Sequence, residues 1–144
     1  MREKAVQRVF VGKGGEDIKT GVGGIRDVEF AVQALQLQHA TDFPRLITGN
    51  TLEARDRLRE AGLVDAERMT TLRSDYVFLR RTEHLIQLLQ DRQTHVLPRE
   101  VRELGALAMR LLGRTAGPGA LRERLAVSRE RVREFFKFVV EAET

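Results

Sequence analysis

Apolar residues recur along the chain with the 3.6-residue period of an α-helix. The period is clear from Asp27 to Ala40, where apolar side chains occupy two neighbouring stripes. A helix that is apolar around most of its circumference is expected to lie centrally in a fold. The stripes consist of Val28, Val32 and Leu35 on one line, and of Phe30, Ala34 and Leu37 beside it.

Capping residues, glycines and prolines divide the rest of the chain into further helices. Asn50 or Thr51 and Asp65 are good N-caps, Gly62 is a natural stop, and Pro98 suits the first turn of a helix. The segment "TDFPRLITGN" predicts a loop, and "GRTAGPG" predicts a turn. The predicted ranges are about 51–61, 66–92, 98–113 and 120–142, as bounded by these residues.

Each of the three longer predicted helices carries an apolar seam. Short connections between long amphipathic helices place neighbours antiparallel, so the pattern predicts an all-α, antiparallel up-and-down four-helix bundle with additional short helices and a Gly-rich N-terminal entry loop. Strand alternation is confined to a doubtful "RVFVG" at 8–12. The seams are Met69, Leu72, Tyr76, Leu79 and Ile86; Val101, Leu104, Ala108 and Leu111; and Leu121, Leu125, Ser128, Val132, Phe135 and Val139.

Composition narrows the class of protein. The 144 residues suffice for one sizeable core, and the absence of cysteine excludes disulfide scaffolds and thiolate zinc sites. No stretch has the roughly 20 apolar residues that cross a bilayer, so we expect a soluble, cytoplasmic protein. The net charge is +4, but Arg alternates with Glu and Asp, as in "LRERLAVSRERVREF". Such mixed arrays are typical of solvated helix faces, and with a single Tyr and no Trp they make nucleic acid an unlikely partner.

The stretch "IKTGVGGIRDVEF" places Gly21, Gly23 and Gly24 directly before the first predicted helix. It matches neither a Walker loop nor a dinucleotide fingerprint, because Lys-Ser/Thr and a preceding strand are both missing. Lys19 and Arg26 flank the glycines, so a backbone nest with two cations could meet a phosphate. A hinge at the entry to the helix is the alternative, and both interpretations remain open.

Two carboxylates near the loop are candidate metal ligands by residue type. Asp27 and Glu29 are two residues apart, which on a helix points them about 200° away from each other. They could not hold one ion together, and Asp27 is better explained as a first-turn acid that complements the helix dipole. His39, His84 and His95 are too scattered to indicate zinc, so no metal site is predicted.

A polar stripe accompanies the apolar seam of the longest predicted helix. Glu83 lies within the seam and therefore needs a partner, for which Arg26, Arg80 and Arg81 are candidates. The simplest role for this group is an internal salt bridge that fixes the register of the helices. The stripe itself comprises Arg80, His84, Gln87 and Asp91 at i, i+4, i+7 and i+11.

Several of these motifs together resemble a known family. They are "K-x-G-x-G-G-I-R-D-x-E-F", "Q-x-L-Q-L", "Y-x-F-L-R-R-x-E-H" and "D-x-Q-T-H-x-L-P", in this order between about Asp17 and Pro98. The segment resembles the helical domain that follows each nucleotidyltransferase domain in bifunctional glutamine synthetase adenylyltransferase/adenylyl-removing enzymes. The last helices match only in pattern, and the opposed activities of the two halves are not distinguished.

The resemblance implies a noncatalytic, substrate-binding-type helical domain beside an active-site cleft. Its implied partners are an adjoining nucleotidyltransferase domain, glutamine synthetase and a PII-type regulator, and magnesium and ATP would serve the parent enzyme rather than this chain. Residues 1–26 would form an N-terminal segment and Gly-rich junction, and 27–144 the helical domain. Lys19, Arg26 and Glu29 would face the cleft with the glycines, and a substitution at Gly23 would leave the bundle folded. A free-standing adaptor that binds a protein or nucleic acid through Arg-rich faces is the alternative.

Overall fold

The computed structural model describes residues 17–90 and 94–143. The predicted all-α class is confirmed: five α-helices pack together, and no strand occurs in these two ranges. An isolated bridge between Asp17 and Val96 is the one β-type pairing among them. The helices are α2 (Ile25–His39), α3 (Thr51–Glu60), α4 (Ala66–Gln90), α5 (Val101–Leu112) and α6 (Pro118–Glu143), with a 3-10 helix at Pro44–Leu46.

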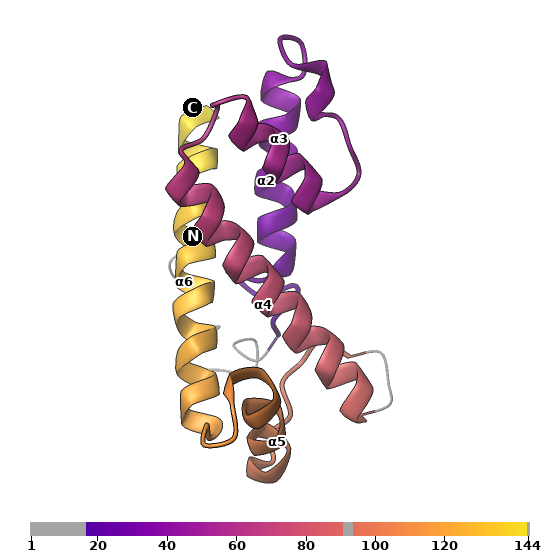
Figure 1. The fold of residues 1–144 in the computed structure, drawn as a ribbon, viewed down its shortest axis with the longest axis vertical. Helices are drawn as coiled ribbons and strands as arrows, with labels where there is room; N and C mark the ends of the chain where they lie inside the picture. The colour runs from indigo at the N-terminus through magenta and orange to yellow at the C-terminus, as the bar shows by residue number, and fades with distance from the viewer. Residues whose placement is uncertain (1–16, 91–93, 144) are drawn as a thin grey trace.

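Three helices run along the length of the molecule (Figure 1). In that view α2 and α6 both rise towards the C-terminal end, and α4 descends obliquely from beside α6 at the upper left to the lower right. The short α3 packs on α2 and α4 near the upper end, whereas α5 packs on α4 and α6 at the lower end. The functional residues discussed below lie where the loop before α2 meets α4 and α6.

The predicted caps are confirmed. Asn50 Oδ1 accepts a hydrogen bond from the Glu53 amide at 2.9 Å, and Asp65 Oδ2 accepts one from the Arg68 amide at 3.1 Å. Gly62 follows α3 with a φ of 73°, a conformation that glycine adopts without strain. These local signals fix the ends of α3 and the start of α4 at or within one residue of the predicted positions.

One helix start is wrong by three residues. α5 begins at Val101, not at Pro98, which is buried in the segment before the helix. Val101 is 71% exposed, so the predicted seam of α5 is also wrong at its first position. Burial on α5 falls on Leu104, Leu107 and Ala108.

The apolar seams of α4 and α6 are confirmed, because every residue predicted for them is buried. The two-stripe prediction for α2 is only half right. Val28, Val32 and Leu35 are buried against the other helices, but Phe30 is 52% exposed and Leu37 is 76% exposed. The helix therefore lies at the side of the described fold, with Phe30 and Leu37 of the second stripe exposed and Ala34 packed against the core.

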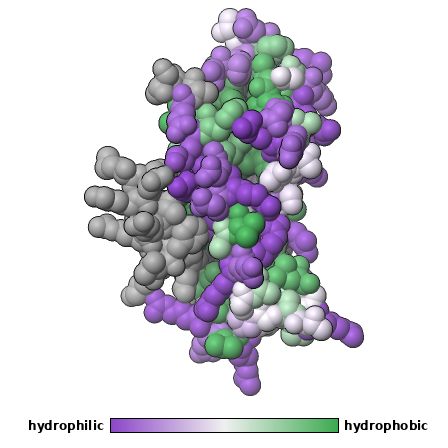
Figure 2. All heavy atoms as spheres, turned by 90° about the vertical axis from the view of Figure 1, so that its left-hand side faces the viewer, coloured by the Kyte–Doolittle hydropathy of each residue, from purple (hydrophilic) through white to green (hydrophobic). Residues whose placement is uncertain are grey.

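The outer surface agrees with the predicted solvated faces. Figure 2 shows a face that is mainly hydrophilic, interrupted by separate hydrophobic patches. None of the helices in residues 17–90 and 94–143 combines the length and apolar character needed to span a membrane. The doubtful strand at 8–12 lies outside the described residues.

Candidate functional site

Hydrogen bonds hold the glycine loop, residues 17–24, in place at its first residue, Asp17. The carboxylate of Asp17 accepts hydrogen bonds from the amides of Lys19 and Thr20, at 3.1 and 2.9 Å, and from the Thr20 hydroxyl. His95 Nδ1 lies 2.8 Å from the same carboxylate, and the Ile18 amide donates to the His95 carbonyl. Partial burial opposes ionisation of Asp17, but the bonds from Thr20 and Lys19 and the nearby His95 prevail and lower its pKa. The segment after α4 thus holds the loop in place.

The second half of the loop packs directly on the backbone of α6. Arg129, which is 2% exposed, donates from Nε and Nη2 to the carbonyl of Val22 at 3.1 and 3.0 Å. Burial lowers the pKa of Arg129 to about 10, against the opposing pull of Asp17 and Asp27, so its guanidinium stays charged at neutral pH. This buried cation joins the loop to the middle of α6.

Gly23 and Gly24 are required by this close approach. A Cβ added to Gly23, whose φ is 74°, would lie 2.2 Å from the Arg129 carbonyl oxygen, and one added to Gly24 would lie 2.6 Å from that of Ile18. These contacts argue against the expectation that a substitution at Gly23 leaves the bundle folded with little loss of stability, because the loop packs against the backbone of α6. The amides of Gly21, Gly23 and Gly24 are also occupied, by Asp17 O, Asp27 Oδ2 and Gly21 O.

Asp27 and Glu29 contact different parts of the molecule. Asp27 is 7% exposed and accepts the Gly23 amide at 2.7 Å, an arrangement in which a first-turn acid caps the start of its own helix. Glu29 Oε2 accepts the hydroxyl of Tyr76 on α4 at 3.0 Å. The residues described contain no group of three side chains placed to hold a metal ion.

Lys19, Glu29, Tyr76, Arg80 and Glu83, which we call the polar row, connect the glycine loop to α2 and α4. Glu83 is 5% exposed; its Oε1 lies 3.1 Å from Arg80 Nη1 and its Oε2 lies 3.8 Å from Lys19 Nζ. Burial raises the pKa of Tyr76, and the neighbouring Glu29 carboxylate raises it further, so the hydroxyl stays protonated and donates. The polar row alternates acidic and cationic groups next to the loop.

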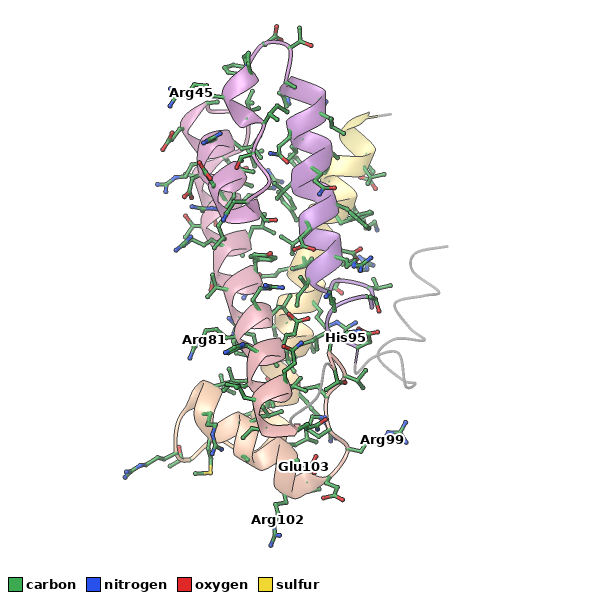
Figure 3. The ribbon with its side chains drawn as sticks, turned by 90° about the vertical axis from the view of Figure 1, so that its right-hand side faces the viewer. Arg45, Arg81, His95, Arg99, Arg102 and Glu103 are labelled. Carbon is green, nitrogen blue, oxygen red and sulfur yellow. The ribbon has the colours of Figure 1, made fainter. Side chains whose placement is uncertain are left out.

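The remaining predicted site residues are not drawn into the polar row. Arg26, Arg81 and His84 are exposed, and no hydrogen bond or ion pair of their side chains is present among the described residues. Figure 3 shows Arg81 pointing away from α4 and His95 beside the loop. Gln87 is half-buried. Asp91 lies outside the described residues.

One buried network was missed in the sequence. Asp75 on α4 is 1% exposed and accepts from Ser128 Oγ at 2.8 Å and from Arg131 Nε and Nη2 at 2.9 and 2.7 Å. These bonds raise the pKa of Arg131. The signal was available, because Asp75 sits in an apolar seam between Leu72 and Leu79 in the same way that Glu83 does.

Comparison with known sequences gives the family. A sequence model described as GlnD PII-uridylyltransferase matches residues 3–140. The chain belongs to the GlnD PII-uridylyltransferase family. The match reaches beyond α5 through most of α6, so the family likeness is not restricted to the segment ending at Pro98.

Curated relatives of this GlnD-type domain carry a different enzyme name. The bifunctional glutamine synthetase adenylyltransferase/adenylyl-removing enzymes of Mycobacterium bovis and Mycobacterium tuberculosis are 40% identical over 138 residues, which is 92% of this chain and 14% of the relative. That of Stenotrophomonas maltophilia is 44% identical over 117 residues, 81% of this chain and 12% of the relative. The resemblance drawn from the motifs is confirmed. The chain is homologous to one helical domain within these enzymes and spans about a seventh of their length.

Proposed function

We propose that this chain acts as the noncatalytic helical domain of a nucleotidyltransferase that adenylylates or deadenylylates glutamine synthetase. In this proposal α2, α4, α5 and α6 form the four-helix unit of substrate-binding type, and α3 is an added short helix. The proposal rests on the family match and on relatives of that name, of which the chain covers only a small part. Glutamine synthetase would be the protein substrate of the whole enzyme, and a PII-type protein its regulator.

The exposed stripe of α2 supports a role beside another domain. Phe30 and Leu37 lie seven residues apart, two turns along one side of the helix, and both are more than half exposed. Arg26 lies one turn before Phe30 and is also exposed. Neighbouring exposed apolar side chains rimmed by charge are typical of protein contacts. We infer that this stripe, which begins at the glycine loop, packs against the nucleotidyltransferase domain and brings Lys19 and Arg26 to its cleft.

The chain's own carboxylates do not fit a magnesium site of the nucleotidyltransferase type. The sequence has no Asp-x-Asp pair, and Asp27 and Glu29 face different partners. Phosphoryl-type transfer depends on metal-held phosphates. Magnesium and ATP are therefore assigned to the adjoining catalytic domain. The contribution of this chain is to cover the active-site cleft of that domain and to position the substrate.

The first test is turnover by the chain alone. Purified protein incubated with magnesium, ATP and glutamine synthetase, or with adenylylated glutamine synthetase and phosphate, is expected to give no more product than a blank. Product formation in either direction by a preparation shown to be free of other nucleotidyltransferases would contradict a noncatalytic role.

The second test addresses the α2 stripe in a longer enzyme that carries this sequence beside its nucleotidyltransferase domain. Phe30→Asp is expected to lower turnover by about a hundredfold, since a misplacement of about 1 Å at an active site can have that effect. Leu88→Asp is the matched control, because Leu88 is 62% exposed on α4. Equal turnover in both variants, with normal folding, would refute the assignment of this face.

A further inference from the structure

A cavity of ≈ 440 Å³ opens between α2, the start of α3 and the middle of α4. This volume falls within the roughly 300–1,000 Å³ of small-molecule sites. Glu29 contributes from α2, Asn50 and Thr51 from the start of α3, and Tyr76, Arg80 and Arg81 from α4. The cavity thus joins one end of the polar row to a helix that the proposed function does not use.

The lining has more donors than acceptors. Arg80 and Arg81 are among the residues that line the cavity, and Glu29 is the one carboxylate in that lining. The Oε2 atom of Glu29 already accepts the Tyr76 hydroxyl. Asn50 uses its side-chain oxygen to cap α3, so its amide nitrogen is the part left to donate. A ligand that accepts several hydrogen bonds and carries negative charge fits this set.

The two guanidinium groups differ in how much they are already used. Arg80 is half exposed and donates from Nη1 to buried Glu83 at 3.1 Å. This hydrogen bond occupies one side of its guanidinium group. The guanidinium of Arg81 is exposed and makes no hydrogen bond or ion pair within the described part of the chain. Figure 3 shows its side chain extended away from the helix axis. Arg81 can therefore bind an oxyanion without breaking an existing contact, and guanidinium groups match phosphate geometry.

We propose that this cavity binds a phosphate group of a small molecule of nucleotide size, with Arg81 as the main cationic contact and Arg80 and Asn50 as further donors. The site goes beyond the proposed function, because it needs neither the neighbouring domain nor the α2 stripe. Inorganic phosphate alone would fill only a small part of the space. A mononucleotide would place its phosphate at the arginines and its remaining atoms along Val77 and Leu52, the apolar part of the lining.

The test is titration of the purified 144-residue chain with AMP and, separately, with inorganic phosphate, followed by NMR of backbone amides and arginine Nε–H groups. AMP is expected to shift the signals of Thr51, Leu52 and Arg81 and to bind more tightly than inorganic phosphate. Arg81→Gln is expected to weaken AMP binding about tenfold, the effect of losing charge-assisted hydrogen bonds. Arg122→Gln is the matched control: Arg122 is an exposed arginine on α6 away from the cavity, and its replacement should change nothing.

The outcomes separate this proposal from its alternatives. Equal weakening by Arg81→Gln and Arg122→Gln would mean nonspecific attraction to a basic protein and would overturn the site. Absence of any shift with AMP would overturn it as well, as would shifts confined to other parts of the chain. Equal affinity for inorganic phosphate and AMP would overturn the nucleotide-sized ligand. Because the measurement is binding by this chain alone, its failure leaves the proposed function standing, and the reverse also holds.

Discussion

Replacement of Gly23 by alanine should be among the most damaging single-methyl changes in this fold. The new Cβ would lie 2.2 Å from the carbonyl oxygen of Arg129 and 2.8 Å from its carbonyl carbon. Both are backbone atoms of α6, so no side chain can rotate away to relieve the contact. The loop or the helix must move by about 1 Å before the distance becomes an ordinary van der Waals contact.

Two contributions set the size of the loss. A φ of 74° is costly for alanine, by about 1–2 kcal/mol. The movement also stretches the bonds of 3.1 and 3.0 Å by which buried Arg129 holds the Val22 carbonyl, and hydrogen bonds to charged groups contribute about 1.5–3 kcal/mol each. We expect the free energy of unfolding to fall by about 3–5 kcal/mol, a large share of the 5–15 kcal/mol that is typical of a domain.

Two other glycines separate these contributions. Gly62 has a φ of 73° and no atom within 4 Å of an added Cβ, so Gly62→Ala should show the backbone strain alone, about 1–2 kcal/mol. Gly24 has a φ of −89°, but its Cβ would lie 2.6 Å from the Ile18 carbonyl oxygen, so Gly24→Ala should show a contact without strain. Gly23→Ala combines both effects and should exceed either one.

The assay is urea unfolding of the three variants followed by circular dichroism. The midpoint should fall most for Gly23→Ala, and the slope of the free energy against urea should be unchanged if the unfolding remains two-state. Equal losses for Gly23→Ala and Gly62→Ala would refute the reasoning, because the contact with α6 would then contribute nothing.

Three further predictions concern carboxylates, of which Glu83 and Asp75 are buried and Asp17 is partly buried. Glu83→Ala should lower the free energy of unfolding by only about 1–2 kcal/mol in the same assay. This is less than the roughly 3–5 kcal/mol expected for a stranded buried charge, because Arg80 is half exposed and water can hydrate its guanidinium. A loss above about 3 kcal/mol would show that Arg80 is not hydrated in the variant. Asp75→Ala should lower the free energy of unfolding by about 3–5 kcal/mol, since it removes the buried acceptor of Ser128, Arg124 and Arg131, and a loss below about 1 kcal/mol would contradict the network. The pKa of Asp17 is lowered by folding, so the stability difference between the native chain and Asp17→Asn should be complete above the unfolded-state pKa of about 4 and shrink as pH falls through the lower, folded-state pKa. A difference that does not change as pH falls below about 4 would exclude this linkage.

The long helices could be predicted because their periodicity is a property of the local sequence. The seam of α6, from Leu121 to Val139, is regular over five turns, and its burial follows whatever partners it meets. Helix caps also depend only on neighbouring residues, because each capping side chain bonds to an amide three residues ahead. Asn50 and Asp65 could therefore be predicted as caps from the sequence. The predicted start of α5 at Pro98 was wrong because proline is compatible with both the first turn of a helix and an extended segment. Tertiary packing decides between these two conformations.

Contacts between distant segments could not be read from one sequence. Arg129 bonds to a carbonyl 107 residues away, and the close approach of Gly23 to the Arg129 backbone joins the same two distant segments. The partner of Glu83 was narrowed to three arginines by its place in the seam, but the contribution of Lys19 from the loop was not foreseen. The environment of exposed apolar residues such as Phe30 and Leu37 could not be predicted for another reason. The helical periodicity of the sequence shows that a face is apolar, but it does not show which part of the protein packs against that face.

The motif "K-x-G-x-G-G-I-R-D-x-E-F" can now be divided by the structure into inward and outward parts. Gly23 and Gly24 permit the close approach to α6 and Ile18, Ile25 is buried in the core, and Asp27 caps the helix. Each of these positions is explained within the chain itself and needs no ligand. Arg26 and Phe30 are fixed positions of the motif whose side chains are exposed and make no hydrogen bond, ion pair or ring contact among the described residues. Under the proposed function, these two positions are therefore the first to substitute in a search for contacts with the nucleotidyltransferase domain.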